Sequence, residues 1–248
     1  MAAENAMQIV DEVIEAHGGM EYWNSLEALD AEISASGFLF TAKQRPVLKH
    51  MRMRALTTEP GFFFYDFPKP GQTGELIGND EVRILDSSGN IVAQRKNPRE
   101  AFRGIRRLLF WDDLDFMYFG GYATWNYLTA PFILARKGFL IETLEPLQSA
   151  SGQLTRLHVT FPPDIPTHSR EQIFCFDDQR LLRRLDYTAE VVGGWAHAAH
   201  LCEEYRTFDR LRAPTDRRVL PLLFGHKPLP GPILVELKLH MVRPVLAV

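Results

Sequence analysis

The chain has 248 residues, of which 46% are hydrophobic and 24% are charged, and its formal net charge at pH 7 is −3. These values are typical of a globular protein that buries a sizeable apolar core, and they argue against an extensively disordered chain. Because the charge balance leaves no excess positive field, nucleic acid is not expected as a partner.

The N-terminal segment and the cysteines bear on the compartment. The first twenty residues carry Glu4, Glu12 and Glu15 and lack the apolar centre of a secretory signal peptide. No apolar run reaches the roughly 18 residues that a membrane-spanning helix needs. Cys175 and Cys202 have neither metal-site nor redox-motif spacing, so we expect buried free thiols in a reducing compartment. The sequence therefore predicts a cytoplasmic protein.

The first predicted element is an amphipathic helix. Apolar residues follow helical spacing over 7–17, and the pair at 18–19 (Gly-Gly) is suited to ending the helix. Apolar and polar residues then alternate over 29–34 and again over 50–55, which predicts strands with one buried face. The run GFFFYDF at 61–67 is apolar on both faces and predicts a strand packed on each side.

A hairpin and a helical insertion follow. The segments 82–85 and 91–94 flank a turn that contains Gly and Asn, as in a β-hairpin. Asn97-Pro98 is typical of a helix start and opens an aromatic-rich insertion over about 98–136. Phe102, Ile105 and Leu109 follow at helical spacing and predict a first helix. In the aromatic-rich part, over 112–136, we expect two short helices, interrupted at Gly120-Gly121 and again before Pro131.

Strand patterns return after the insertion. Alternation over 157–161, 173–175, 180–187 and 233–241 predicts further strands, whereas 195–201 fits either a strand or a helical turn. With about ten strands joined by short turns, the pattern favours an antiparallel meander. We therefore predict a mainly β (α+β) fold and a single domain over 1–248.

One known superfamily shows a similar order of elements. The helix ending in His17-Gly18-Gly19, the Trp23 that follows and the nearly continuous antiparallel strands with one helical insertion resemble the bacterial half-barrel lipoprotein carriers. That superfamily also contains a cofactor-free enzyme of violacein biosynthesis. The resemblance implies a curved sheet or half-barrel with an apolar cavity beneath a helical lid, here the insertion. The chain departs from exported carriers because it has no signal, so lipoprotein transport and functional residues are not carried over.

Aromatic residues are the main candidates for ligand binding. They are dense in the insertion, and tyrosine and tryptophan offer flat apolar area with a polar tip, which suits a planar ligand. Alternatively, these residues only pack the insertion on the sheet. The candidate ligand-binding residues are Phe62, Phe64, Trp111, Tyr118, Phe119, Tyr122, Trp125 and Trp195.

Five polar residues are candidates for proton transfer. If they converge on the cavity, His168 or His200 would act as a base, Asp186 would orient it, and Arg170 or Tyr187 would stabilise negative charge. The alternative is structural: a core histidine with satisfied hydrogen bonds, and an ion pair of Arg170 at a sheet edge. No nucleotide, phosphate-loop, serine-hydrolase or zinc-protease motif is present in the sequence, and we expect neither cofactor nor metal.

Two functions remain open. The first is the binding of an apolar or aromatic small molecule or lipid between the sheet and the helical lid. The alternative is a cofactor-independent enzyme, an isomerase, cyclase or lyase, that uses the polar residues in the same cavity. The sequence does not decide between an enzyme and a binding protein, nor does it fix the oligomeric state.

Overall fold

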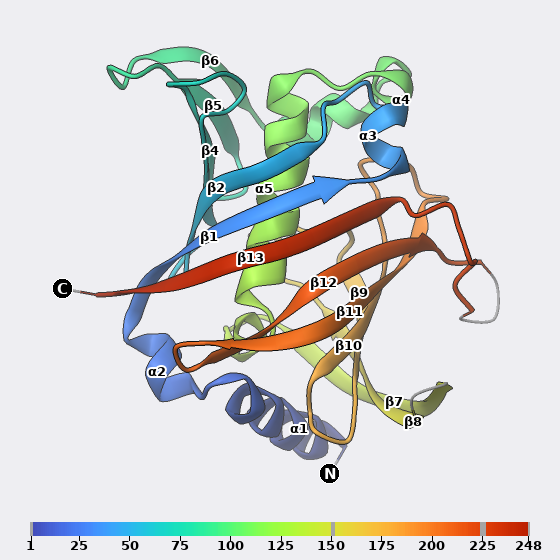
Figure 1. The fold of residues 1–248 in the computed structure, drawn as a ribbon. Coiled ribbons are helices and arrows are strands. Elements are labelled where there is room, and N and C mark those ends of the chain that lie inside the picture. The colour runs from blue at the N-terminus through green and yellow to red at the C-terminus, as the bar shows by residue number, and fades with distance from the viewer. Residues whose placement is uncertain (1, 150–151, 224–226, 248) are drawn as a thin grey trace.

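The computed structural model describes residues 2–149, 152–223 and 227–247, and within these ranges thirteen strands form one antiparallel sheet. The sheet is open, with β6 and β7 as its edges, and it curves around a central helix (Figure 1). The strands are β1 (Leu26–Ser36), β2 (Leu48–Leu56), β3 (Gly61–Tyr65), β4 (Thr73–Ile77), β5 (Glu81–Leu85), β6 (Ile91–Lys96), β7 (Leu140–Ser149), β8 (Gly152–Thr160), β9 (Glu171–Phe176), β10 (Leu182–Thr188), β11 (His197–Phe208), β12 (Leu211–Pro221) and β13 (Val235–Leu246).

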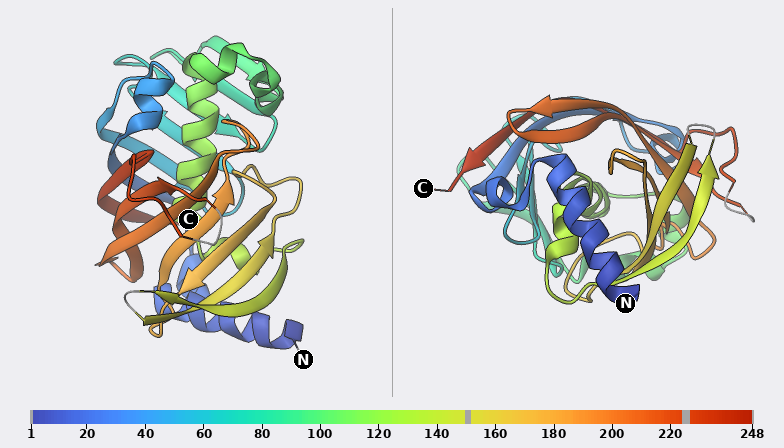
Figure 2. Two further views of the ribbon diagram at one scale, coloured as in Figure 1. Left: turned by 90° about the vertical axis from the view of Figure 1, so that its right-hand side faces the viewer. Right: turned by 90° about the horizontal axis from the view of Figure 1, so that it is seen from below.

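The helices lie at the ends of the curved sheet and in its hollow. The longest, α5, stands inside the curve, α1 closes the lower end, and α3 and α4 lie at the upper end (Figures 1 and 2). In the described residues, no helix is long and apolar enough to cross a membrane. The helices are α1 (Ala2–His17), α2 (Met20–Asn24), α3 (Phe38–Ala42), η1 (Pro98–Arg103), α4 (Arg106–Leu109), α5 (Asp113–Thr129) and η2 (Phe132–Ala135).

The sheet consists of two meanders that meet along one seam. Strands β1 to β6 lie side by side in chain order, and so do strands β7 to β13. The two sets join only where β1 pairs with β13, for example Ala31 opposite Val242 and Ser34 opposite Lys238. Every other neighbouring pair of strands is consecutive in the sequence, which accounts for the short turns that predicted a meander.

The predicted mainly β fold with a curved antiparallel sheet is confirmed, but the sheet has thirteen strands rather than about ten. The sequence analysis missed β4, β7 and β12. Prolines obscured two of them: Pro146 lies at a register shift in the edge strand β7, and Pro214 interrupts the pattern of β12. In β4, Gly74 weakens the strand pattern, yet a Cβ atom there would lie 2.5 Å from the Met117 Sδ atom of α5.

The break predicted at Gly120-Gly121 is wrong, because one long helix, α5, runs through both glycines; the break predicted before Pro131 is present. Asp112 caps α5: its carboxylate accepts a hydrogen bond from the Asp115 backbone N–H, and the Asp115 carboxylate accepts one from the Asp112 N–H. The helix continues through Gly120-Gly121 to Thr129. The glycines permit close packing, because a Cβ atom on Gly121 would lie 3.1 Å from Met117 Cε and 3.3 Å from Leu76 Cβ.

The position of α5 also differs from that of an outer lid. Twelve of its 17 residues are buried, and it packs on β2 to β5 along the inner face of the sheet. A helix that is apolar nearly all round is a core helix, because no face remains for solvent. The aromatic density of this segment therefore serves the core first, and only one face of α5 is left for a cavity.

Candidate functional site

An apolar cavity of about 450 Å³ lies between α5 and the inner face of the sheet. The α5 side is formed by Phe116, Phe119, Gly120, Ala123 and Tyr127, which recur every three or four residues and so share one face of the helix. The opposite wall comes from both meanders of the sheet. It includes Ile33 and Ala35 of β1, Leu237 of β13, Val219 of β12 and Ala198 of β11.

Small side chains account for the empty space. Gly120 and Ala123 occupy the middle of the lining face of α5, and Ala35 and Ala198 lie on the strands that line the cavity. Protein interiors are otherwise close-packed, so a cavity of this size requires that facing positions lack large side chains. The cavity is therefore built into the sequence by small residues between aromatic ones.

Exposed apolar side chains surround the mouth of the cavity. Phe38 of α3, Leu108 of α4, Trp195 of the β10–β11 loop and Leu223 beyond β12 all belong to its lining. Their exposed fractions are 55%, 47%, 73% and 56%, respectively. Large apolar side chains gathered in this way usually mark a binding site, because exposing them to water is unfavourable.

The polar end of the cavity is formed around His168. The hydroxyl of Tyr127 lies 2.8 Å from His168 Nε2, and the hydroxyl of Tyr122 lies 3.2 Å from His168 Nδ1. Tyr187 stacks on the imidazole with ring centroids 4.0 Å apart, and its hydroxyl lies 3.2 Å from that of Tyr127. His168, Tyr127 and Tyr187 line the cavity, whereas Tyr122 lies behind the histidine.

Burial keeps this histidine uncharged. Loss of hydration, together with the nearby positive charge of Arg99, lowers the pKa of His168 to about 3. Arg99 is held in place because its guanidinium donates to the backbone oxygens of Thr167 and His168. At neutral pH the imidazole therefore has one N–H and one acceptor nitrogen.

A buried arginine lies behind Tyr127. The Arg217 guanidinium is 5.2 Å from the Tyr127 ring and donates to the Tyr127 backbone oxygen and to Cys202 Sγ. His200 is next to it, 3.5 Å from Arg217 Nη1, and burial followed by the charge of Arg217 lowers the pKa of His200 well below its usual value. Among the described residues, no carboxylate forms an ion pair with Arg217, and no group of three His, Cys, Asp or Glu could hold a metal ion.

The five candidate proton-transfer residues do not converge. His168 and Tyr187 meet at the cavity, and His200 lies nearby against the Tyr127 ring. Arg170 is exposed and donates only to the Phe161 backbone oxygen among its recorded hydrogen bonds.

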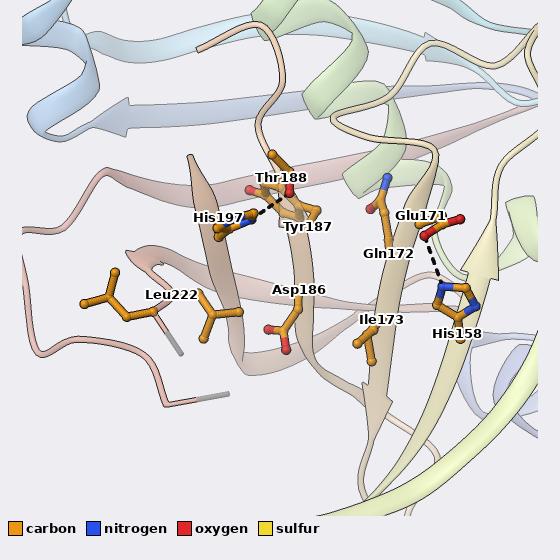
Figure 3. A pocket seen from close by; sticks show the side chains of 10 residues that line it. His158, Glu171, Gln172, Ile173, Asp186, Tyr187, Thr188, His197 and Leu222 are labelled. Carbon is orange, nitrogen blue, oxygen red and sulfur yellow. Dashed lines mark hydrogen bonds and ion pairs between the residues drawn. The ribbon is translucent and has the colours of Figure 1, made fainter. Parts of the chain in front are cut away.

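Asp186 lies on the opposite face of β10 from its neighbour Tyr187, so it cannot orient His168 or His200. Arg184 donates to it at 2.6 Å. Figure 3 shows Asp186 in a second depression of about 440 Å³, next to its cross-strand partner Ile173; Tyr187 and His197 line both this depression and the cavity. Alternation along a strand explains this result, because adjacent residues point to opposite faces.

Three of the eight candidate ligand-binding residues line the cavity: Phe64, Phe119 and Trp195. The other five lie in the core and do not line the cavity, although the sequence analysis predicted that they bind the ligand. Trp125, for example, donates its indole N–H to the Leu56 backbone oxygen at 2.8 Å. These five residues are Phe62, Trp111, Tyr118, Tyr122 and Trp125.

Sequence reasoning missed two residues of the polar end. Thr124 and Tyr127 both line the cavity; Thr124 was not predicted, and Tyr127 was counted only as part of the aromatic-rich insertion and not as a site residue. The signal was the helical spacing of small residues: Gly120 and Ala123 fall on the same face as Tyr127. Sequence reasoning weighed aromatic density and did not look for small residues on one face.

Comparisons with known proteins agree on the fold. No protein-family model and no curated protein matches the chain. A putative outer membrane lipoprotein-sorting protein domain from Vibrio parahaemolyticus has a TM-score of 0.55 and 12% identity, with 98% of this chain and 93% of that chain covered. A LolA superfamily protein from Nitrosomonas europaea has a TM-score of 0.54 and 11% identity, with coverage of 98% and 94%. A DUF1329 family protein from Desulfovibrio piger has a TM-score of 0.55 and 10% identity, with coverage of 96% and 92%.

Proposed function

We propose that the chain binds a lipid or another hydrophobic small molecule in the cavity between α5 and the sheet, because its fold is lipoprotein-carrier-like. The observation that carries the proposal is an apolar cavity of about 450 Å³ with exposed apolar side chains at its mouth. At roughly 30 Å³ per water-sized group, this volume holds a chain of about fifteen such groups. The solved structure from Vibrio parahaemolyticus, described as lipoprotein-sorting, supports the same class of ligand.

The energetics of apolar burial suit such a ligand. Burying a chain of about twelve methylene groups contributes on the order of 10 kcal/mol at roughly 0.8 kcal/mol each. Loss of translational and rotational freedom costs at least about 4 kcal/mol. The remainder, roughly 6 kcal/mol, corresponds to a dissociation constant of tens of micromolar.

A cavity-filling variant tests the proposal. Ala123→Phe places a ring inside the cavity, whereas Ala247→Phe places the same ring on an exposed position near the C-terminus. We expect binding of Nile red, followed by its fluorescence, to weaken at least tenfold in Ala123→Phe and to stay within twofold in Ala247→Phe. Native mass spectrometry of the purified protein should show bound lipid in the wild type and less in Ala123→Phe.

The wild type must bind the dye for the proposal to stand. Equal affinity of the wild type and Ala123→Phe would place the dye elsewhere on the protein and would contradict binding in the cavity. Near-ultraviolet circular dichroism of both variants checks that each retains its fold.

A further inference from the structure

The hydroxyl groups at the polar end form an open chain of hydrogen bonds. In order, the groups are Tyr122, His168, Tyr127 and Tyr187, joined by three contacts of 3.2, 2.8 and 3.2 Å. No other hydrogen bond of these three hydroxyls is recorded among the described residues. The series of hydrogen bonds therefore begins at Tyr122 and ends at Tyr187.

This series of hydrogen bonds has one donor more than it has contacts. Each tyrosine contributes one O–H, and the neutral imidazole of His168 contributes one N–H. Four donors are available for three contacts, and each contact uses one proton. One O–H is left without an acceptor among the described residues, whichever tautomer the histidine adopts.

Burial decides where the spare donor lies. If Tyr122 held it, the O–H would be fully buried without a partner, which is costly. Tyr122 therefore donates to His168 Nδ1, and His168 Nε2–H donates to Tyr127. The spare O–H then belongs to Tyr187 or Tyr127, and both residues line the cavity.

The surrounding charge favours the same kind of ligand atom. Arg217 lies behind Tyr127, buried and without a carboxylate partner among the described residues. Its positive charge opposes an ammonium group at this end of the cavity and favours an atom with a partial or full negative charge. A hydrogen-bond acceptor oxygen satisfies both the spare donor and the electrostatic field.

We propose that the polar end of the cavity binds the acceptor oxygen of an acyl or ketone group, which the hydroxyl of Tyr187 or Tyr127 holds while the hydrocarbon lies along the apolar walls. This inference rests on the proposed function, because it names the class of hydrophobic ligand. A pure hydrocarbon fills the cavity but leaves the O–H without a partner. An oxygen acceptor at the same position completes the hydrogen-bond chain.

A matched pair of ligands tests the inference. Methyl undecyl ketone and tridecane have the same chain length and differ by one carbonyl oxygen, and each is titrated by displacement of Nile red. We expect the ratio of ketone affinity to alkane affinity to be about fivefold to tenfold higher in the wild type than in the double variant Tyr127→Phe/Tyr187→Phe, as the loss of one hydrogen bond would give.

Two controls accompany the variant. Tyr22→Phe removes a hydroxyl that bonds to Asp209 outside the cavity, and it should keep the wild-type ratio. The primary amine of the same chain length should bind the wild type no more tightly than the alkane. If the double variant does not fold, infrared spectroscopy of the wild type with carbon-13-labelled ketone gives the answer, since a hydrogen-bonded carbonyl absorbs at lower wavenumber than the same ketone in hexane.

Each outcome is decisive. A ratio that is unchanged in the double variant, or an unshifted carbonyl band, would overturn the inference and leave the proposed function intact if the alkane binds. Failure of both ligands to bind the wild type would overturn the proposed function and, with it, this inference.

Discussion

Three buried histidines share an uncharged state, although they lie in different parts of the interior. Burial lowers the pKa of His17 to about 4 and that of His168 to about 3, and it lowers the pKa of His200 well below the usual 6.5. Each of the three has an arginine close enough to lower its pKa further. Protonation of any of them in the folded protein would place a second positive charge in the core.

The stability of the protein should therefore fall as pH is lowered from 7.5 to 5. Below pH 6.5 the unfolded chain binds protons at these histidines and the folded chain does not, so acid favours unfolding, and the full stability is present above pH 6.5. For each histidine, the loss is about 2 kcal/mol at pH 5. Urea unfolding at several pH values measures this dependence.

A single variant isolates one histidine. His17→Gln should lower by about one the number of protons that the protein takes up on unfolding near pH 5. If the free energy of unfolding of His17→Gln depends on pH as it does in the wild type, His17 does not cause the loss of stability in acid. The loss would then come from carboxylates.

At the scale of single residues, the sequence predicted some residues of the site but not which of them lie together at the cavity. His168 and Tyr187 were predicted because polar groups near strand ends often carry function, and both reach the cavity. Asp186 was grouped with them by proximity in sequence, yet alternation along β10 turns it to the other face. The hydrogen bonds of Tyr127 were not predicted, because its partners, His168 and Tyr187, are 41 and 60 residues away along the chain.

At the scale of elements, α5 shows how one segment serves both the core and the cavity. Most of its faces pack tightly on the strands, with Gly121 against Leu76 and Met117. The remaining face carries Gly120 and Ala123 and leaves the cavity open. The sequence predicted a helical segment here but placed a break at the glycines, since glycine is a poor helix former when packing is not considered.

A substitution at the tightly packed glycine should destabilise the protein. We expect Gly121→Leu to lower the free energy of unfolding by about 1–3 kcal/mol or more, because the side chain must displace Leu76 or Met117. Gly104→Leu is the matched control: a Cβ atom there meets no atom within 4 Å, so the change should stay within about 0.5 kcal/mol. Thermal unfolding of both variants measures the difference, and equal stabilities would contradict tight packing at Gly121.

At the scale of the whole molecule, the seam between β1 and β13 holds the two meanders together. Lys238 lies at this seam, paired with Ser34 on one side and with Asp216 on the other, while its side chain is exposed. The cavity takes its walls from both meanders. The shape of the cavity therefore depends on the hydrogen bonds between β1 and β13, two strands that are far apart in the sequence.

A proline substitution in β13 tests whether the fold and the cavity depend on the pairing of β1 with β13. Lys238→Pro removes a backbone donor between two paired strands without changing the core, and we expect a loss on the order of 3 kcal/mol, with weaker binding of Nile red. Gln94→Pro makes the same change in the edge strand β6, which has a neighbour on one side only, and should cost less. Equal losses would show that the seam has no special role, and guanidinium unfolding compares the two.

The seam also bears on how the chain folds in time. Each meander can form from consecutive hairpins, but closing the seam joins residues such as Ser34 and His240, 206 positions apart. Distant contacts of this kind slow folding far more than they reduce equilibrium stability. Until the seam closes, the two walls lie on separate half-sheets, so the cavity forms only when the two halves of the sheet come together.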